Sequence, residues 1–154
     1  RISMDYSGKE LVLVCILKGA FMFLSDLVRR LKIPAKIDFV RLASYGSGMK
    51  SSGTVEITKD IELSIEGKDV LIIEDIIDSG HTLQFLKERI ILSKPRSVKI
   101  CALLDKKGRR QVGMEADYLG IEVDDVFIVG YGIDFNENYR HLPEIYYVTN
   151  IDVP

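Results

Sequence analysis

The segment EDIIDSGHT, residues 74–82, brings together the side chains with the clearest chemical potential in the sequence. Ser79 and Gly80 allow a tight turn whose backbone N–H groups can hold a phosphate, and the hydroxyls of Ser79 and Thr82 add donors. The three carboxylates of the segment would repel a bare phosphate. A sugar phosphate accompanied by magnesium fits better, because ribose hydroxyls and the cation satisfy closely spaced acids. The residue types therefore indicate a sugar-phosphate site.

The same segment can also be explained by structural roles alone, without catalysis or ligand binding. Ser79 and Thr82 are expected helix caps, and a capped helix start alone would explain DSGHT. Glu74 and Asp75 point to opposite sides of a strand, so at least one of them can be only solvated or salt-bridged. The segment is neither a GxxxxGK[ST] phosphate loop nor a GxGxxG dinucleotide fingerprint. Taken by itself, the motif leaves these readings open.

Apolar runs and helical spacing alternate along the chain. Strands are expected at 11–17, 35–43, 69–74 and 97–104, with weaker ones near 127–132 and 145–149. One helix is expected over 17–31 and another after Thr82, with Pro34 and Pro95 beyond their ends; their apolar stripes are Ala20, Leu24, Leu27, Val28 and Leu31, and Leu83, Leu86 and Ile90. Residues 44–53 are expected to form a mobile loop and 54–65 an antiparallel hairpin or arm. This order predicts an α/β fold with an open, mostly parallel sheet, in which ligands bind at the carboxyl ends of the strands.

Composition narrows the class of protein. The 154 residues fit one domain, 1–154, and 23 acidic against 21 basic side chains give no electrostatic case for nucleic acid or an anionic membrane. Cys15 and Cys101 lie in apolar runs as expected core thiols, which fits a reducing cytoplasm, and the two histidines are too far apart for a zinc site. No apolar run is long enough to cross a membrane. The abrupt start at RISMDYSGKE leads us to expect that an N-terminal segment is missing.

The stretch VLIIEDIIDSGHT, residues 70–82, closely resembles the signature of phosphoribosyltransferases that use 5-phosphoribosyl 1-diphosphate. Further stretches are similar to the bacterial hypoxanthine-guanine phosphoribosyltransferases and follow in the same order: LKGA (17–20), SYGSG (44–48), LLDKKGRR (103–110) and FIVGYGIDFNENYRHLP (127–143). The resemblance implies the type I phosphoribosyltransferase fold, a twisted sheet flanked by helices with a flexible flap or hairpin and a small hood region. The helix that usually precedes the first strand is mostly absent.

The resemblance also implies an activity. Hypoxanthine or guanine would receive the 5-phosphoribosyl group, giving the nucleoside 5'-monophosphate and pyrophosphate in purine salvage. The cofactor would be Mg²⁺, the partners would be small-molecule substrates, and the assembly would be a homodimer or homotetramer. Neither the sequence nor the resemblance ranks hypoxanthine, guanine and xanthine.

Roles at the sugar and phosphate end follow residue by residue from the resemblance. The loop residues Asp78, Ser79, Gly80, His81 and Thr82 would cradle the 5-phosphate, His81 through its amide alone. Glu74 and Asp75 would hold the ribose hydroxyls or magnesium, and Asp78 would exchange a proton with N7 of the purine. Lys18, Gly19 and Arg140 would bind pyrophosphate, with a cis peptide before or within the lysine-glycine pair, and Ser44 and Tyr45 would lie on the flap.

The resemblance assigns a second set of residues to the purine: Lys106, Phe127, Ile128, Ile133 and Asp134. Lys106 would donate to the 6-oxo group, Phe127 would stack on the base, and the main chain of Ile128 would contact its edge. Ile133 would form the opposite apolar wall, and Asp134 would lie at a second magnesium ion. Without the resemblance, DKKGRR reads as a solvated basic turn and FIV as core.

The residues alone also leave two other classes of protein possible. A phosphorylation-switched receiver domain also has an acidic pair after a parallel strand, but here Asp105 would have to serve as the phosphoacceptor. A non-catalytic regulator on the same scaffold would bind nucleotides and RNA, although the sequence has no basic stripe.

Overall fold

The computed structural model describes residues 1–45 and 54–149 of the chain. A six-stranded sheet has the order β3-β2-β1-β4-β5-β6, and a two-stranded sheet pairs β7 with β8. The strands are β1 (Leu11–Leu17), β2 (Ala35–Tyr45), β3 (Thr54–Lys59), β4 (Asp69–Ile77), β5 (Ser97–Asp105), β6 (Tyr118–Glu122), β7 (Phe127–Val129) and β8 (Tyr146–Val148), and the helices are α1 (Ile2–Asp5), α2 (Phe21–Val28), α3 (His81–Ile91) and the 3₁₀ turn η1 (Lys107–Arg109). The main sheet is parallel except for β3, which confirms the expected fold class.

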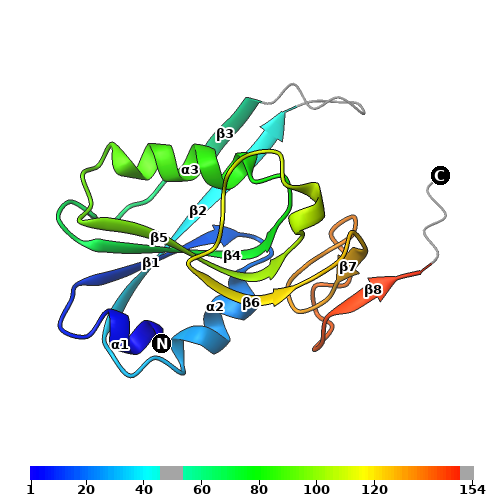
Figure 1. Ribbon diagram of the computed structural model, residues 1–154, viewed down its shortest axis with the longest axis horizontal. Helices are drawn as coiled ribbons and strands as arrows, with labels where there is room; N and C mark the ends of the chain where they lie inside the picture. The colour runs from blue at the N-terminus through cyan, green and yellow to red at the C-terminus, as the bar shows by residue number, and fades with distance from the viewer. Residues whose placement is uncertain (46–53, 150–154) are drawn as a thin grey trace.

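Strands β1 and β4 lie side by side at the centre of the sheet, and the chain leaves them in opposite directions. From β1 it passes through α2 to β2, and from β4 it passes through α3 to β5 (Figure 1). In open α/β sheets a crevice forms at such a switch point, outside the carboxyl ends of the two strands. The two stretches that follow β1 and end β4 are LKGA and EDIIDSGHT, so the topology brings them to one place.

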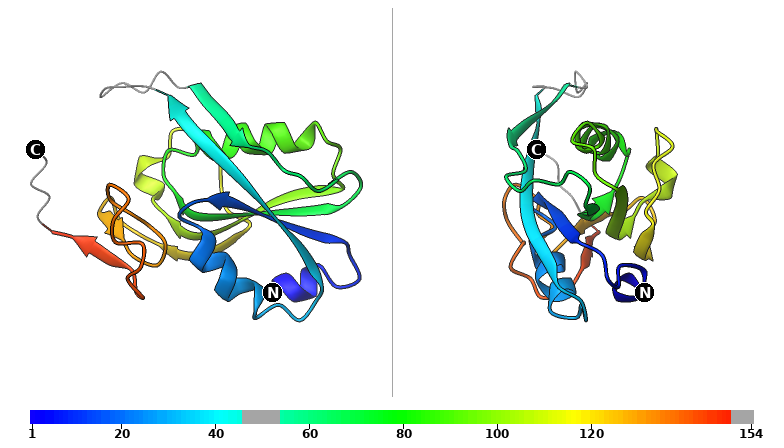
Figure 2. Two further views of the ribbon diagram at one scale, coloured as in Figure 1. Left: turned by 180° about the vertical axis from the view of Figure 1, so that it is seen from behind. Right: turned by 90° about the vertical axis from the view of Figure 1, so that its left-hand side faces the viewer.

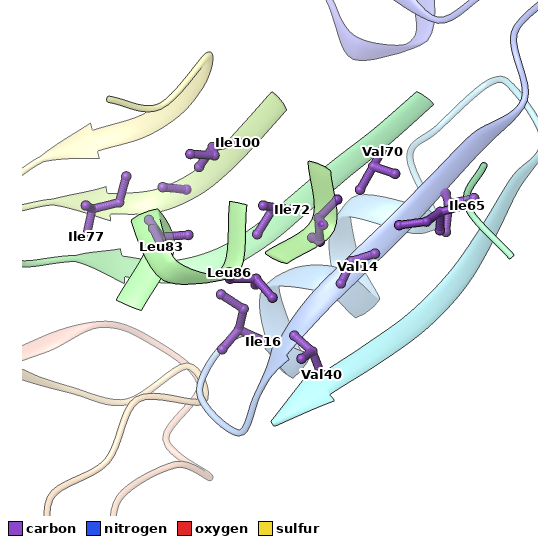
Figure 3. Packing of buried hydrophobic residues seen from close by; sticks show 13 residues of the cluster. Val14, Ile16, Val40, Ile65, Val70, Ile72, Ile77, Leu83, Leu86 and Ile100 are labelled. Carbon is purple, nitrogen blue, oxygen red and sulfur yellow. The ribbon is translucent and has the colours of Figure 1, made fainter. Parts of the chain in front are cut away.

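The central strands are buried on both faces, and their alternate residues enter two different cores. Val12, Val14 and Ile16 pack with the α3 stripe, whereas Leu11, Leu13 and Cys15 pack with Ala20 and Leu24. Figure 3 shows the α3 side of the sheet, where Leu83 and Leu86 face the side chains of β1 and β4. The expected apolar stripe of α3 is therefore confirmed. Helix α3 covers one face of the sheet, and α2 covers the other.

The hood and the arm lie at the edges of this core. Strands β7 and β8 form a small antiparallel unit beside the main sheet, and β2 and β3 project from it as a long arm (Figures 1 and 2). Both expected C-terminal strands exist, but they pair with each other and do not extend the main sheet. The expected arm ends early, at Lys59, because the chain then turns: both Glu62 N and Leu63 N donate to Oδ2 of Asp38, at 2.8 Å.

Several expected boundaries are wrong. Strand β2 continues through Ser44 and Tyr45, which pair with Val55 and Thr54, so the predicted loop begins later and its residues 46–53 lie outside the described part. Helix α2 begins at Phe21 and ends at Val28, so Leu31 lies beyond it. Ser79 and Thr82 do not cap α3; its N-cap is Gly80, with φ of 90°, a conformation that glycine adopts without strain.

Both cysteine thiols are free and buried, as expected. Burial raises the pKa of Cys15 and of Cys101 to about 12, so neither thiol ionises near neutral pH. Among the described residues, no helix is long and apolar enough to cross a membrane.

Replacing Leu86 by alanine tests the packing of α3 on the sheet. Leu86 has no exposed surface, so the substitution leaves a cavity and is expected to lower the free energy of unfolding by about 2–5 kcal/mol. Urea unfolding followed by circular dichroism measures this change. The matched control is Leu92→Ala just beyond the same helix, where 72% of the residue is exposed and a change below about 0.5 kcal/mol is expected. Equal effects of the two variants would contradict the packing described.

Candidate active site

Three chain segments meet so closely that only glycine fits between them. A Cβ on Gly19, in the turn after β1, would lie 1.6 Å from Oδ2 of Asp75 in β4. A Cβ on Gly132, in the turn after β7, would lie 2.2 Å from the carbonyl oxygen of Gly19. A side chain at Gly132 would collide with backbone, and one at Gly19 would require the Asp75 carboxylate or the turn to move. The end of β4, the β1–α2 turn and the loop between β7 and β8 (residues 130–145, the hood loop) therefore form one site at the switch point between β1 and β4.

The β1–α2 turn presents Lys18 to this site. The peptide bond between Leu17 and Lys18 is cis, the first of the two positions expected. Lys18 Nζ lies 2.9 Å from Oε2 of Glu137, a residue of the hood loop. Glu137 was absent from the sequence-based set, and Lys18 holds the pKa of its carboxyl below the ordinary value.

Arg140 belongs to the same loop as Glu137 and is fixed by several contacts. Its Nη1 donates to the carbonyl oxygen of Gly132 at 2.8 Å, and its Nη2 lies 2.8 Å from Oδ1 of Asp134. The second oxygen of Asp134 accepts a hydrogen bond from the backbone N–H of Glu137, also at 2.8 Å. Lys18, Arg140 and Asp134, which lie far apart in the sequence, thus belong to one charged cluster.

The acidic pair in β4 divides between two environments. Glu74 is buried, and burial together with the neighbouring Asp75 carboxylate raises its pKa well above the ordinary value. Its Oε1 accepts a hydrogen bond from Asp75 N at 3.1 Å. Asp75 instead lies against Gly19, and its Oδ1 accepts a hydrogen bond from Ile76 N at 2.7 Å. Asp75 is therefore the acid of the pair that faces the Lys18–Gly19 turn.

Residues 110–112 fix the loop from Asp78 to Thr82 through hydrogen bonds to its carbonyl groups. Arg110 donates from Nη1 to the carbonyl oxygen of Asp78 at 2.8 Å and also pairs with the buried Asp105. The carbonyl oxygen of Ser79 accepts hydrogen bonds from Gln111 N and Val112 N, at 3.0 and 3.3 Å. The carbonyl groups of Asp78 and Ser79 are thus already bonded to the protein.

The N–H groups of the same loop are left for a ligand. Within residues 1–45 and 54–149, the backbone N–H groups from Ser79 to Thr82 donate to no protein acceptor; the first helical bond of α3 runs from Gln84 N to Gly80 O. Several unpaired N–H groups at a helix start form an anion site. This arrangement suits a phosphate.

The carboxylate of Asp78 stands beside one arginine, Arg109, which the sequence alone did not single out. Arg109 Nε lies 3.2 Å from Oδ1 of Asp78, and Arg109 Nη1 lies 3.5 Å from Oδ1 of Asp125. In the described part of the chain, Oδ1 of Asp78 accepts no hydrogen bond, although it is buried. The Asp78 side chain as a whole is 44% exposed, so its carboxylate remains accessible to a ligand.

The residues expected at the purine lie around the end of β5 and in the hood. Lys106 is buried, with 7% of its surface exposed, and its N–H donates to Ile77 O at 2.9 Å. Ile128 and Ile133 pack with Leu104 in a small apolar cluster. Phe127 is 39% exposed, and its ring and that of Phe135 are nearly perpendicular, with centroids 5.2 Å apart. A partly exposed aromatic ring and a largely buried lysine therefore occur at neighbouring ends of the two sheets.

The acids of the site could hold a magnesium ion through one or two carboxylates but, within residues 1–45 and 54–149, not through a complete protein ligand set. The described residues contain no group of three or more histidine, cysteine or acidic side chains placed to hold a metal ion. Asp75 lies against Gly19, and Asp134 pairs with Arg140 in the loop after β7. Mg²⁺ commonly takes one or two carboxylates and completes its shell with water and substrate phosphates, so this donor set fits it.

Comparison with known proteins defines the class. A model of the phosphoribosyl transferase domain matches residues 1–136, and the chain belongs to this family. Hypoxanthine phosphoribosyltransferase from Salmonella typhimurium is 49% identical over 146 residues, covering 95% of this chain and 82% of that protein. Hypoxanthine-guanine phosphoribosyltransferase from Aquifex aeolicus is 49% identical over 149 residues, covering 96% and 84% of the two chains.

The fold agrees with this relationship. A crystal structure of hypoxanthine phosphoribosyltransferase from Staphylococcus aureus superposes with a TM-score of 0.92 at 48% identity, covering 96% of this chain and 80% of that chain. The resemblance found in the sequence is therefore confirmed, and a receiver domain is excluded.

Proposed function

We propose that this protein transfers the 5-phosphoribosyl group from 5-phosphoribosyl 1-diphosphate to hypoxanthine or guanine in purine salvage. The products are IMP or GMP and pyrophosphate. The observation that carries the proposal is the meeting of three segments at Gly19, Asp75 and Gly132, beside the unpaired N–H groups of residues 79–82. The relatives named above, which are transferases at 49% identity, favour an enzyme over a non-catalytic regulator.

The sugar end of the substrate occupies the β4–α3 loop in this proposal. Backbone N–H groups of residues 79–82 and the hydroxyls of Ser79 and Thr82 bind the 5-phosphate, which the helix dipole also favours. Asp75 accepts hydrogen bonds from the ribose hydroxyls. Glu74, whose raised pKa favours the protonated acid, supports Asp75 from the buried side.

The pyrophosphate leaves toward Lys18 and Arg140. As the bond from C1' to the pyrophosphate oxygen breaks, the sugar becomes oxocarbenium-like and negative charge grows on the leaving group. Fixed cations stabilise that charge without reorganisation, and the guanidinium fork of Arg140 suits phosphate oxygens. Asp75 and Asp134 would hold Mg²⁺, which supplies further neutralisation of the pyrophosphate charge. Ser44 and Tyr45 belong to the flap that excludes water.

The purine lies between Phe127 and the apolar side chain of Ile133, with its edge at the main chain of Ile128. N9 of the purine forms the new bond to C1'. Asp78 accepts the proton that the base releases at N7. Lys106 donates to the 6-oxo group, which favours hypoxanthine and guanine over adenine. We also propose a cytoplasmic homodimer or homotetramer; the buried free thiols fit a reducing compartment.

A product assay with hypoxanthine, guanine, xanthine and adenine in parallel tests the substrate class. Each base is supplied with 5-phosphoribosyl 1-diphosphate and Mg²⁺, and nucleotide formation is followed by chromatography. The proposal predicts nucleotide from hypoxanthine or guanine and little from adenine. No nucleotide from any base would refute it, and equal activity with adenine would refute the role of Lys106.

Replacing Lys106 by glutamine tests base selectivity directly. Loss of a charged hydrogen-bond donor is expected to reduce kcat/KM for hypoxanthine by about 10- to 150-fold, while the low activity with adenine changes much less. The control is Lys107→Gln, because Lys107 is exposed and pairs with Glu122 at 2.7 Å. A loss of the same size for both bases would point to a role other than recognition of the 6-oxo group.

A further inference from the structure

The cations expected to receive the pyrophosphate are already neutralised within the protein. Lys18 Nζ lies 2.9 Å from Oε2 of Glu137, and Arg140 Nη2 lies 3.4 Å from the same oxygen. Arg140 Nη2 also lies 2.8 Å from Oδ1 of Asp134. Two cations and two carboxylates give the cluster no net positive charge, although its ligand would carry several negative charges.

Glu137 is the member of the cluster best able to move away. Its side chain is 65% exposed, against 19% for Arg140 and 29% for Asp134. Arg140 is tied to the carbonyl oxygen of Gly132, and Asp134 is tied to Arg140 and to the N–H of Glu137. Both contacts of the Glu137 carboxylate are exposed ion pairs, which contribute little and are readily exchanged.

The oxygen of Glu137 also stands where a phosphate oxygen would stand. It is the one atom within 3.4 Å of both Lys18 Nζ and Arg140 Nη2 among the ion pairs of the described residues. A carboxylate and a phosphate use the same geometry toward lysine and arginine. Arg140 Nε is buried and has no hydrogen-bond partner within residues 1–45 and 54–149.

We propose that the Glu137 carboxylate is a competing anion, which fills the pyrophosphate position between Lys18 and Arg140 in the free enzyme and swings into solvent when the diphosphate binds. The inference rests on the proposed function, because that function assigns pyrophosphate to these two cations. When pyrophosphate is the product, the returning carboxylate replaces it. Glu137 thereby weakens the hold on pyrophosphate and hastens its release.

Binding of magnesium pyrophosphate to the Glu137→Gln variant tests this role. Glutamine keeps the length and shape of the side chain and removes only its charge, so it is preferable to alanine. Isothermal titration calorimetry is expected to show that the variant binds magnesium pyrophosphate about two- to fivefold more tightly than the unaltered protein. Stopped-flow measurement is expected to show slower release of pyrophosphate.

Two controls separate competition from a general change of charge. Glu62→Gln also removes an exposed carboxylate that pairs with a lysine at 2.9 Å, but it lies on the β3–β4 connection and should leave the affinity unchanged. In a Lys18→Met background, the gain from Glu137→Gln is expected to fall by at least about half, because the shared partner is gone.

The outcomes are distinct from those of the proposed function. If the unaltered protein forms nucleotide and binds magnesium pyrophosphate, but Glu137→Gln binds it equally or more weakly, competition by Glu137 is refuted while the function stands. If Glu62→Gln gives the same gain, the effect is long-range charge and the inference is also refuted. If the unaltered protein neither forms nucleotide nor binds magnesium pyrophosphate, the proposed function fails and this inference with it.

Discussion

Gly19→Ala is expected to lower kcat/KM for 5-phosphoribosyl 1-diphosphate by at least about 100-fold while the sheet remains folded. The added Cβ would lie 1.6 Å from Oδ2 and 2.6 Å from Cγ of Asp75, so either the β1–α2 turn or the Asp75 carboxylate must move by more than an ångström. Displacements of about 1 Å in groups that orient a substrate cost about 100-fold in rate. Initial rates measured over a range of 5-phosphoribosyl 1-diphosphate concentrations give the effect, and thermal unfolding reports on the fold.

Gly113→Ala is the matched control for this substitution. A Cβ on Gly113 would meet no heavy atom within 4 Å, so the variant tests the cost of a methyl group without a clash. Its activity is expected to stay within about twofold of the unaltered protein, as for other surface substitutions. Near-normal activity of Gly19→Ala would mean that the contact between Gly19 and Asp75 does not shape the site.

Asp78→Asn is expected to lower kcat by about 100- to 10,000-fold near neutral pH, the range typical of a positioned acid or base. The amide keeps the shape of the side chain but cannot accept the proton of the purine. The KM for 5-phosphoribosyl 1-diphosphate should change little, because the 5-phosphate is assigned to the N–H groups of the loop, and these do not depend on the carboxylate. Steady-state kinetics with hypoxanthine as the fixed substrate separates the two constants.

The control for Asp78→Asn uses the other partner of Arg109. Asp125 lies 3.5 Å from Arg109 Nη1 and is 62% exposed, so Asp125→Asn frees the same arginine without altering Asp78. A small effect of Asp125→Asn beside a large effect of Asp78→Asn assigns the loss to the Asp78 carboxylate. Unchanged turnover of Asp78→Asn would rule out proton exchange at this residue, although the phosphate site could still be correct.

The sequence predicts well those parts of the fold that are buried on both sides. Strands β1 and β4 are continuous apolar runs, and the stripe of Leu83, Leu86 and Ile90 has helical spacing, so hydrophobic burial alone locates them. Strand β6 was missed because it lies at the edge of the sheet. Only Tyr118 of its five residues is buried, which leaves neither alternation nor an apolar run to detect.

Boundaries were less predictable because partners distant in sequence decide them. Strand β2 extends to Tyr45 since β3 pairs with it across residues 46–53, and β4 extends to Ile77 since β5 pairs with it as far as Asp105. The arm ends where Asp38 accepts two N–H groups of residues 62 and 63. Local sequence carries no mark of such contacts.

The candidate site shows the same division. Lys18, Asp78 and Arg140 stand in motifs that a family resemblance identifies, and the structure brings Lys18 and Arg140 into one cluster. Glu137, Arg109 and Arg110 lie in the same motifs, but the resemblance assigns them no role, and by residue type each looks like a solvated charge in a polar turn. Lys18 and Glu137 are 119 positions apart, so only the folded chain shows that they touch.

The most direct test of the central claim is the stoichiometry of products formed from hypoxanthine, 5-phosphoribosyl 1-diphosphate and Mg²⁺. IMP is quantified by chromatography and pyrophosphate by a coupled assay in the same samples. Phosphoribosyl transfer in a site closed to water predicts that IMP and pyrophosphate appear in equal amounts, and that pyrophosphate formation stops when hypoxanthine is left out. Pyrophosphate released without IMP, or neither product from a folded protein, would contradict the account.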